Sequence, residues 1–211
     1  MEKTNKKIII KIGSSVLMTK DNKLDEIYIL HIADQIKYLK DRGFRLVLVV
    51  SGALAIGSNF IDLASGSHER KQAAAGIGQA FLISTFQRIF NDEKINIAQI
   101  LLTKDFLKKS EKRELLNRII GIYFESGIIP VLNENDVIDL NSFGGNDFLA
   151  ADAAILLQGD QMLILSSWDG AEYGVGGGKT KKKATEILFK NNIKTEIVDG
   201  KVYNTILNSI L

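Results

Sequence analysis

The sequence predicts an α/β domain built on an open sheet, and three observations lead to that prediction. Short apolar runs typical of buried strands alternate with longer segments of helical hydrophobic periodicity. These apolar runs end in small or polar residues, and ligands bind at that edge of open α/β sheets. The 211 residues, 45% of them hydrophobic, suit one domain with one core, since domains commonly have roughly 100 to 200 residues.

The first expected strand covers residues 7–12 and ends at Gly13. Lys11 lies near its carboxyl end, where a buried ammonium group is unfavourable unless it has an anionic partner such as a phosphate. Strand alternation alone allows the other reading, in which Lys11 lies on an exposed face. A helix over about residues 25–42 should follow, with Gly43 as its C-terminal stop.

The second expected strand, residues 45–50, is followed by the small residues 51–53. Small residues leave room for a ligand and expose backbone N–H groups that can bind anions. A long helical segment lies within residues 66–90 and contains Gly76 and Gly78. Glycine inside a helix costs about 1 kcal/mol relative to alanine, so we expect a tight helix crossing or a subunit contact there.

A third strand is expected at residues 97–102, and helix should follow as far as residue 126, with Gly127 ending it. The next apolar run, residues 128–132, reads as a buried strand and changes abruptly into the polar stretch 133–136. A polar, acidic cluster at the carboxyl end of a buried strand is typical of a ligand site in an open α/β sheet.

Two glycines, residues 144–145, precede a further helical segment that runs to residue 157. Asn146 or Asp147 should cap this helix, because a side-chain oxygen can accept hydrogen bonds from free N–H groups of the first turn. The same residues also suit a plain strand-loop-helix connection, since turns favour Asn, Asp and Gly.

A strand at residues 161–166 precedes the sequence GVGGGKTKKKA, residues 174–184, which leads into a helix. Glycines followed by Lys and Thr at a helix start commonly bind phosphate through backbone N–H groups and the helix dipole. The spacing does not match a Walker A loop, and a flexible Gly and Lys linker is the alternative. A last strand at residues 195–198 and a helix from Lys201 close the chain.

Composition excludes several classes of protein. The chain has no cysteine, so it forms neither disulfides nor zinc-thiolate sites. The apolar run 8–12 is interrupted by a lysine and is too short for a signal sequence or a membrane span, which favours a cytoplasmic protein without a membrane partner. A net charge of +2 gives no indication of a nucleic-acid partner, although residues 179–183 form one basic cluster.

Seven segments together resemble the glutamate 5-kinases of the amino acid kinase family. They are IIIKIGSSVL, LVLVVSGALAIG, KQAAAGIGQAFLIS, AQILLTKDF, GIIPVLNENDVI, FGGNDFLAADAA and GVGGGKTKKKA. They occur in the family's order, and the resemblance covers residues 7 to about 200. KIGSS and NEND followed by GND are specific to this branch in combination. The resemblance implies a three-layer αβα sandwich around a mostly parallel sheet.

The resemblance also implies an activity, its cofactors and its partners. The activity is transfer of the γ-phosphoryl group of ATP to the γ-carboxylate of L-glutamate, with Mg²⁺, in proline biosynthesis. Proline would act as a feedback inhibitor, and the protein would form a homo-oligomer. A carboxylate nucleophile with a pKa of about 4.3 is already ionised and needs no general base. The protein must instead position two anions and neutralise developing charge, which calls for lysines, Mg²⁺ and glycine amides.

The family motifs imply site residues by their positions in this sequence. The catalytic residues implied are Lys11, Lys181 and Asp147, of which Asp147 orients the two lysines. The substrate-binding residues implied are Ser51, Gly52, Ala53, Asp136 and Asn146, with Asp136 meeting the α-ammonium group of glutamate. The nucleotide-binding residues implied are Lys11, Gly13, Ser166, Ser167, Gly176, Gly177 and Lys181. No side chain is assigned as a metal ligand.

The chain departs from the family pattern at several places. Gly145 stands where the family has Asp, and Ser166-Ser167 where it has Thr-Asp. We expect one amino acid kinase domain over residues 1–211, shortened in the nucleotide segment near residues 170–174 and at the C-terminus, without an accessory C-terminal domain. Two alternatives follow: a catalytically impaired binding module with this fold, or a relative acting on another small carboxylate or phosphate.

Overall fold

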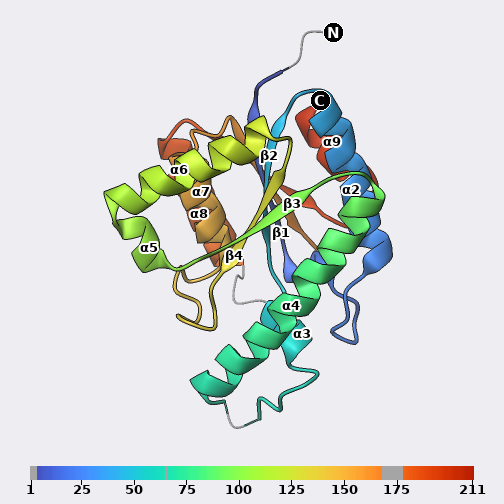
Figure 1. Ribbon diagram of the computed structural model, residues 1–211, viewed down its shortest axis with the longest axis vertical. Coiled ribbons are helices and arrows are strands. Elements are labelled where there is room, and N and C mark those ends of the chain that lie inside the picture. Colours follow the sequence, from blue (N-terminus) through green and yellow to red (C-terminus); the bar gives the residue numbers. More distant parts are fainter. Residues whose placement is uncertain (1–3, 65, 168–177) are drawn as a thin grey trace.

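A six-stranded sheet forms the centre of the computed structural model, which describes residues 4–64, 66–167 and 178–211 (Figure 1). The strand order is β3-β4-β2-β1-β5-β6, and every pairing is parallel. The strands are β1 (Lys7–Ile12), β2 (Arg45–Val50), β3 (Ile97–Leu102), β4 (Ile129–Glu134), β5 (Gln161–Ser166) and β6 (Lys194–Asp199). Parallel strands need crossover connections, and helices supply them here.

Helices cover both faces of the sheet. The helices are α1 (Ser14–Leu17), α2 (Glu26–Asp41), α3 (Ala53–Gly57), α4 (His68–Asp92), α5 (Lys104–Lys108), α6 (Ser110–Glu125), α7 (Asn146–Leu156), α8 (Gly178–Lys190) and α9 (Thr205–Ile210). One buried cluster joins the sheet to α1, α2, α3, α4 and α9, and a second joins its other face to α6, α7 and α8. The prediction of a three-layer αβα sandwich is therefore confirmed.

Strand alternation divides β1 between the two apolar layers. Ile8, Ile10 and Ile12 pack in the first cluster, whereas Ile9 packs in the second. Because side chains alternate with a period of two, Lys11 lies on the same face as Ile9, toward α7 and α8. Its position on β1 thus directs a buried ammonium group at the first turn of α7.

Gly78 of α4 and Gly57 of α3 mark a tight helix crossing, so the prediction of such a crossing is confirmed at Gly78. A Cβ atom on Gly78 would overlap the carbonyl oxygen of Ala53, and one on Gly57 would overlap the carbonyl oxygen of Ala74. The backbones of α3 and α4 therefore touch, and no side chain fits between them. Gly76 has more room, since its Cβ would lie 3.1 Å from a methyl group of Val137.

Several predicted boundaries are corrected by the structure. The strand expected at residues 128–132 is Ile129–Glu134, so two polar residues belong to the strand. The helix expected up to residue 126 is divided into α5 and α6. The helix expected from Lys201 begins at Thr205. Residue 25 is the N-cap of α2 and accepts a hydrogen bond from Tyr28 N–H at 3.1 Å.

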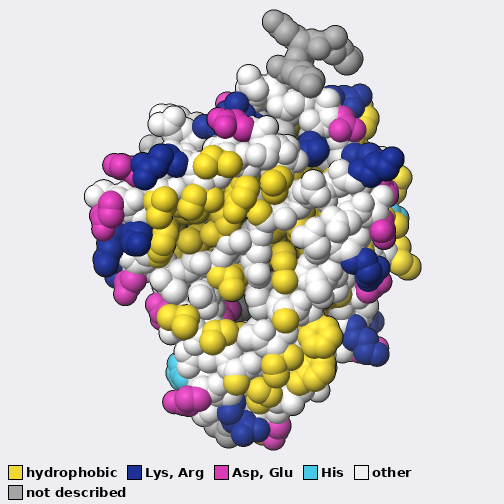
Figure 2. Space-filling view, in the orientation of Figure 1, with side chains coloured by type: hydrophobic (Ala, Val, Ile, Leu, Met, Phe, Trp, Pro, Cys, Tyr) yellow, Lys and Arg dark blue, Asp and Glu magenta, His cyan; other side chains and the backbone are white. Residues whose placement is uncertain are grey.

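Apolar side chains also reach the surface. Figure 2 shows them gathered in a band beside β3 and α6 and in a second group around α3 and α4. Phe60 and Phe81 are both exposed, and their rings stack with centroids 5.0 Å apart. No helix in the described part of the chain has both the length and the apolar character needed to cross a membrane.

Candidate active site

A cleft of about 1300 Å³ opens at the carboxyl ends of the central strands. β1 pairs with β2 on one side and with β5 on the other. The strands β2 to β4 are therefore added on one side of β1, and β5 and β6 on the other, so the strand order reverses at β1. Ligands bind at such switch points in open α/β sheets. The predicted site residues among the described ones all line this cleft: Lys11, Gly13, Ser51, Gly52, Ala53, Asp136, Asn146, Asp147, Ser166, Ser167 and Lys181. Gly176 and Gly177 lie outside the described residues.

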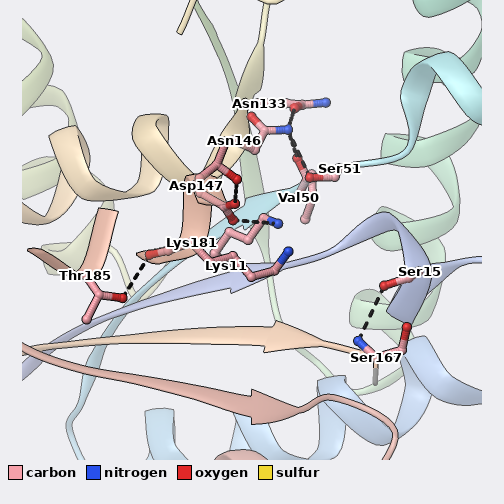
Figure 3. A network of polar contacts seen from close by, with 11 residues as sticks. Lys11, Ser15, Val50, Ser51, Asn133, Asn146, Asp147, Ser167, Lys181 and Thr185 are labelled. Carbon is pink, nitrogen blue, oxygen red and sulfur yellow. Dashed lines mark hydrogen bonds and ion pairs between the residues drawn. The ribbon is translucent and has the colours of Figure 1, made fainter. Parts of the chain in front are cut away.

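An ion pair between Lys11 and Asp147 lies at the centre of the cleft (Figure 3). Lys11 Nζ is 2.9 Å from Asp147 Oδ1, and the two side chains are only 7% and 1% exposed. The reading that placed Lys11 on an exposed strand face is therefore wrong. Thr180, in the first turn of α8, donates a hydrogen bond of 2.7 Å to Asp147 Oδ2. The carboxylate thus connects β1, α7 and α8.

Lys181 brings a second positive charge to the same carboxylate. Burial lowers the pKa of Lys181, the positive charge of Lys11 lowers it further, and the negative charge of Asp147 opposes both effects. Two cations beside one buried carboxylate give this set of three side chains a net positive charge. Such an arrangement favours binding of an additional anion between the lysines.

Asn146 and Asp147 do not cap α7, and the predicted capping role is wrong. The N-cap is Gly145, which makes no side-chain cap and has φ 121°, a conformation that favours glycine. Both side chains make tertiary contacts instead. Asn146 Nδ2 lies 3.0 Å from Val50 O, 3.0 Å from Ser51 Oγ and 2.8 Å from Asn133 Oδ1. The first turn of α7 therefore organises the cleft.

Two carboxylates, one in the last residue of β4 and one just after it, hold the backbone of the connection between β4 and α7. Asp136 accepts a hydrogen bond of 2.9 Å from Asn141 N–H, and Glu134 accepts one of 3.1 Å from Phe143 N–H. Burial is the main effect that raises the pKa of Asp136. Glu134 is only 5% exposed and also lines the cleft.

Glu134 should make the stability of the protein depend on pH. Burial raises its pKa from an ordinary value of 4.5 to about 7, the negative charges of Asp136 and Asp139 adding to burial and the N–H groups of Phe143 and Gly145 opposing it. Between these two pKa values the folded state holds a proton that the unfolded state has lost. The free energy of unfolding should therefore fall as pH rises from 4.5 to about 7.

The measurement is chemical denaturation across this pH range, with Glu134→Gln as the control that cannot titrate. The difference in stability between the wild type and this variant should change steadily with pH. A constant difference would show that the pKa of Glu134 is not raised.

Small residues border the part of the cleft near the ends of β1 and β5, away from Asp136 and Glu134. Gly13 packs so closely that an added Cβ would lie 3.1 Å from Leu165 O. Ser167 N–H lies 3.4 Å from Ser15 Oγ, which joins the ends of β1 and β5. Lys182 and Glu186 of α8 also line this end.

Four residues around the site were not among those predicted. Asn133 and Glu134 belong to the polar stretch that was expected to border a ligand site, but they received no individual role, and the structure shows that they extend β4. Thr180 follows a glycine-rich segment, and that sequence signal pointed to it. Gln79 lies in a helix far along the chain, so its bond to Asn133 depends entirely on the fold.

No group of three or more His, Asp or Glu side chains able to hold a metal ion occurs among the residues that the structure describes. Protein Mg²⁺ sites often use only one or two carboxylates together with phosphates of the substrate. A site of that kind would not include three such side chains.

Comparisons with known proteins agree with this architecture. Residues 6–196 match the family model described as Amino acid kinase family. The chain is 30% identical to glutamate 5-kinase of Clostridium acetobutylicum in an alignment 239 positions long, which covers 96% of this chain and 90% of that protein. Isopentenyl phosphate kinase has a TM-score of 0.68 at 18% identity, covering 96% of this chain and 95% of that one. UMP kinase from Ureaplasma parvum has a TM-score of 0.67 at 16% identity, covering 98% and 95%.

Proposed function

Because the chain belongs to the amino acid kinase family, we propose that it is a glutamate 5-kinase. It would transfer the γ-phosphoryl group of ATP to the γ-carboxylate of L-glutamate, the first step toward proline. The observation that carries this proposal is the placement of Lys11, Lys181 and Asp147 in one cleft with the predicted substrate residues. The identity to a glutamate 5-kinase supports the choice of acceptor.

The reaction needs charge neutralisation rather than a base. A γ-carboxylate oxygen attacks the γ-phosphorus, the bond to the β,γ-bridging oxygen breaks, and the products are an acyl phosphate and ADP. Lys11 and Lys181 lie where they can bind the phosphoryl oxygens as charge shifts toward the leaving group. Asp147 holds the Lys11 ammonium at 2.9 Å, so less reorganisation is needed when the nucleotide binds.

The substrate end of the cleft combines one carboxylate with hydrogen-bonding groups. Asp136 suits the α-ammonium group, whereas Ser51 and the backbone of Gly52 and Ala53 suit carboxylate oxygens. Gly52 has φ 112°, which turns the chain sharply between β2 and α3 and places these groups at the cleft. Asn146, bonded to Ser51, completes this end.

We propose that the nucleotide end is a shortened version of the family site. The alignment with the Clostridium protein is 239 positions long, more than the 211 residues of this chain, so that relative has residues without a counterpart here. We place the shortening near residues 170–174 and expect weaker ATP binding as its consequence. We also propose a homo-oligomer, which the exposed apolar groups beside β3 and around α4 support.

The direct test is a coupled assay of ADP release with Mg-ATP and L-glutamate, together with separate calorimetric titrations of each substrate. ADP release that depends on glutamate, with trapping of the acyl phosphate by hydroxylamine, is the expected result. Binding of glutamate without ADP release would favour a binding module instead. Release with another small carboxylate but not with glutamate would reassign the acceptor.

Asp136→Asn should mainly weaken glutamate binding. Loss of the charge opposite the α-ammonium group should raise the KM for L-glutamate about tenfold or more, with little change in kcat or in the KM for ATP. The measurement is steady-state kinetics with each substrate varied in turn.

Asp139→Asn is the matched control, because Asp139 lies in the same loop but is exposed and does not line the cleft. It should behave like the wild type. A fall confined to kcat in Asp136→Asn would instead place Asp136 among the catalytic residues.

A further inference from the structure

A chain of side-chain amides connects α4 with the substrate end of the cleft. Asn133 Nδ2 donates to Gln79 Oε1 at 2.7 Å, and Asn146 Nδ2 lies 2.8 Å from Asn133 Oδ1. Asn146 Nδ2 is also 3.0 Å from Ser51 Oγ (Figure 3). Gln79 is 9% and Asn133 2% exposed, so water cannot replace these partners freely. We call Gln79, Asn133 and Asn146 the amide chain.

Two backbone groups fix the direction of the amide chain. Glu134 N–H donates to Asn133 Oδ1 at 2.9 Å, and Val50 O accepts from Asn146 Nδ2 at 3.0 Å. A backbone N–H can only donate and a carbonyl oxygen can only accept, so neither asparagine can reverse its amide without losing a bond. Asn133 must therefore turn Nδ2 toward Gln79, which must present Oε1.

This direction leaves a buried polar atom unpaired at each end. Gln79 Nε2 and Asn146 Oδ1 have no hydrogen-bond partner among the described residues. Unpaired buried donors and acceptors are unfavourable and rare. The arrangement at the cleft thus comes at a cost in stability, which is typical of functional sites rather than of the core.

The direction of the amide chain determines which hydrogen bonds Ser51 can make at the cleft. Asn146 Nδ2 has two hydrogens for three acceptors, so Ser51 Oγ shares one of them with another acceptor. Because Nδ2 cannot accept, the Ser51 hydroxyl hydrogen stays available to another acceptor. Ser51 lines the cleft, and a ligand carboxylate can only accept. A reversed amide chain would engage the hydroxyl hydrogen and leave only lone pairs facing a carboxylate, which would repel it.

We propose that Gln79 is a positioning residue for substrate recognition, although it does not line the cleft. The two backbone groups set the direction of the asparagine amides, and Gln79 holds Asn133 in the position where that direction is useful. Asn133 in turn holds Asn146, so that the Ser51 hydroxyl is kept as a hydrogen-bond donor to a carboxylate of the acceptor substrate. This inference rests on the proposed function for the identity of that carboxylate.

The neighbouring residue keeps Gln79 in place. Gly78 packs against the carbonyl oxygen of Ala53, so α4 cannot come closer to the segment that follows Ser51 without a clash. Adjacent residues of α4 thus touch both sides of the substrate end: Gly78 meets α3, and Gln79 meets β4.

The first test needs no substrate and compares two variants. Gln79→Met has a similar shape but no acceptor, whereas Gln79→Glu keeps an oxygen for Asn133 Nδ2. Side-chain amide spectra should show Asn133 and Asn146 hydrogens exchanging with solvent faster in Gln79→Met and nearly as in the wild type in Gln79→Glu. Unchanged Asn133 and Asn146 signals in Gln79→Met would overturn the positioning role.

The second test is kinetic. Gln79→Met should raise the KM for L-glutamate about tenfold, leave the KM for ATP unchanged, and be largely rescued in Gln79→Glu. Equal effects on both KM values, or no effect on either, would overturn the proposal. A wild-type protein inactive with glutamate would overturn the proposed function instead, and the amide spectra would still decide the role of Gln79.

Discussion

Lys181→Ala should lower kcat about 100- to 1000-fold, the loss found when one group that stabilises transition-state charge is removed. The side chain lines the cleft beside Asp147 and Lys11, where a second cation is needed as the phosphoryl group moves between two anions. It is partly buried and its own positive charge is unfavourable there, so stability should fall little. The measurement is kcat with saturating ATP and glutamate, alongside thermal denaturation.

Lys183→Ala provides the matched control for this variant. Lys183 lies two residues further along α8, is exposed and does not line the cleft. Its removal changes net charge equally but should leave kcat within about twofold of the wild type, since distant exposed charges are screened by solvent and salt. Equal losses in both variants would mean that general charge, rather than Lys181 itself, supports turnover.

Asp147→Asn should have the largest effect on stability. The substitution preserves shape but leaves the Lys11 ammonium buried without its counter-ion. Removing one partner of a buried ion pair typically lowers the free energy of unfolding by about 3 to 5 kcal/mol. Turnover should also be lost, because Lys11 and Thr180 both contact this carboxylate. Urea denaturation measures the first effect and ADP release the second.

The double variant Lys11→Met with Asp147→Asn separates the two consequences. It removes the uncompensated charge, so much of the lost stability should return, since replacing a buried pair is often close to neutral. Turnover should not return, because Lys11 is needed for the phosphates. A double variant no more stable than Asp147→Asn would show that the ion pair is not what stabilises this part of the core.

The sequence predicted the strands of this protein well because each is a short apolar run bounded by breaks in the pattern. Lys7–Ile12, Arg45–Val50, Ile97–Leu102 and Gln161–Ser166 agree with the runs expected for them. Burial on both faces of a parallel sheet requires such runs, so local composition carries the information. The end of α2 before Gly43 was also predicted from a local signal, because glycine readily adopts the positive φ, here 87°, that ends a helix.

Roles that depend on partners distant in sequence could not be read locally. Asn146 and Asp147 look like capping residues because capping uses the same side chains at a helix start. Only the packing of α7 against β1 and β2 directs Asp147 to Lys11 and Asn146 to Val50 and Ser51. The polar end of β4 was misread for a similar reason, since the buried positions of Asn133 and Glu134 depend on their neighbours.

The sequence by itself determined the alternation of strands and helices, the small residues after the central strands, and the family to which the chain belongs. The tertiary structure decided that Lys11 is buried, that Asp147 binds it from another layer, and that Gln79 bonds to Asn133 at the end of β4. The physical reason is the distance along the chain over which each effect acts. Backbone propensity and hydrophobic period act within a few residues, whereas a buried charge or amide is acceptable only where the fold supplies its partner.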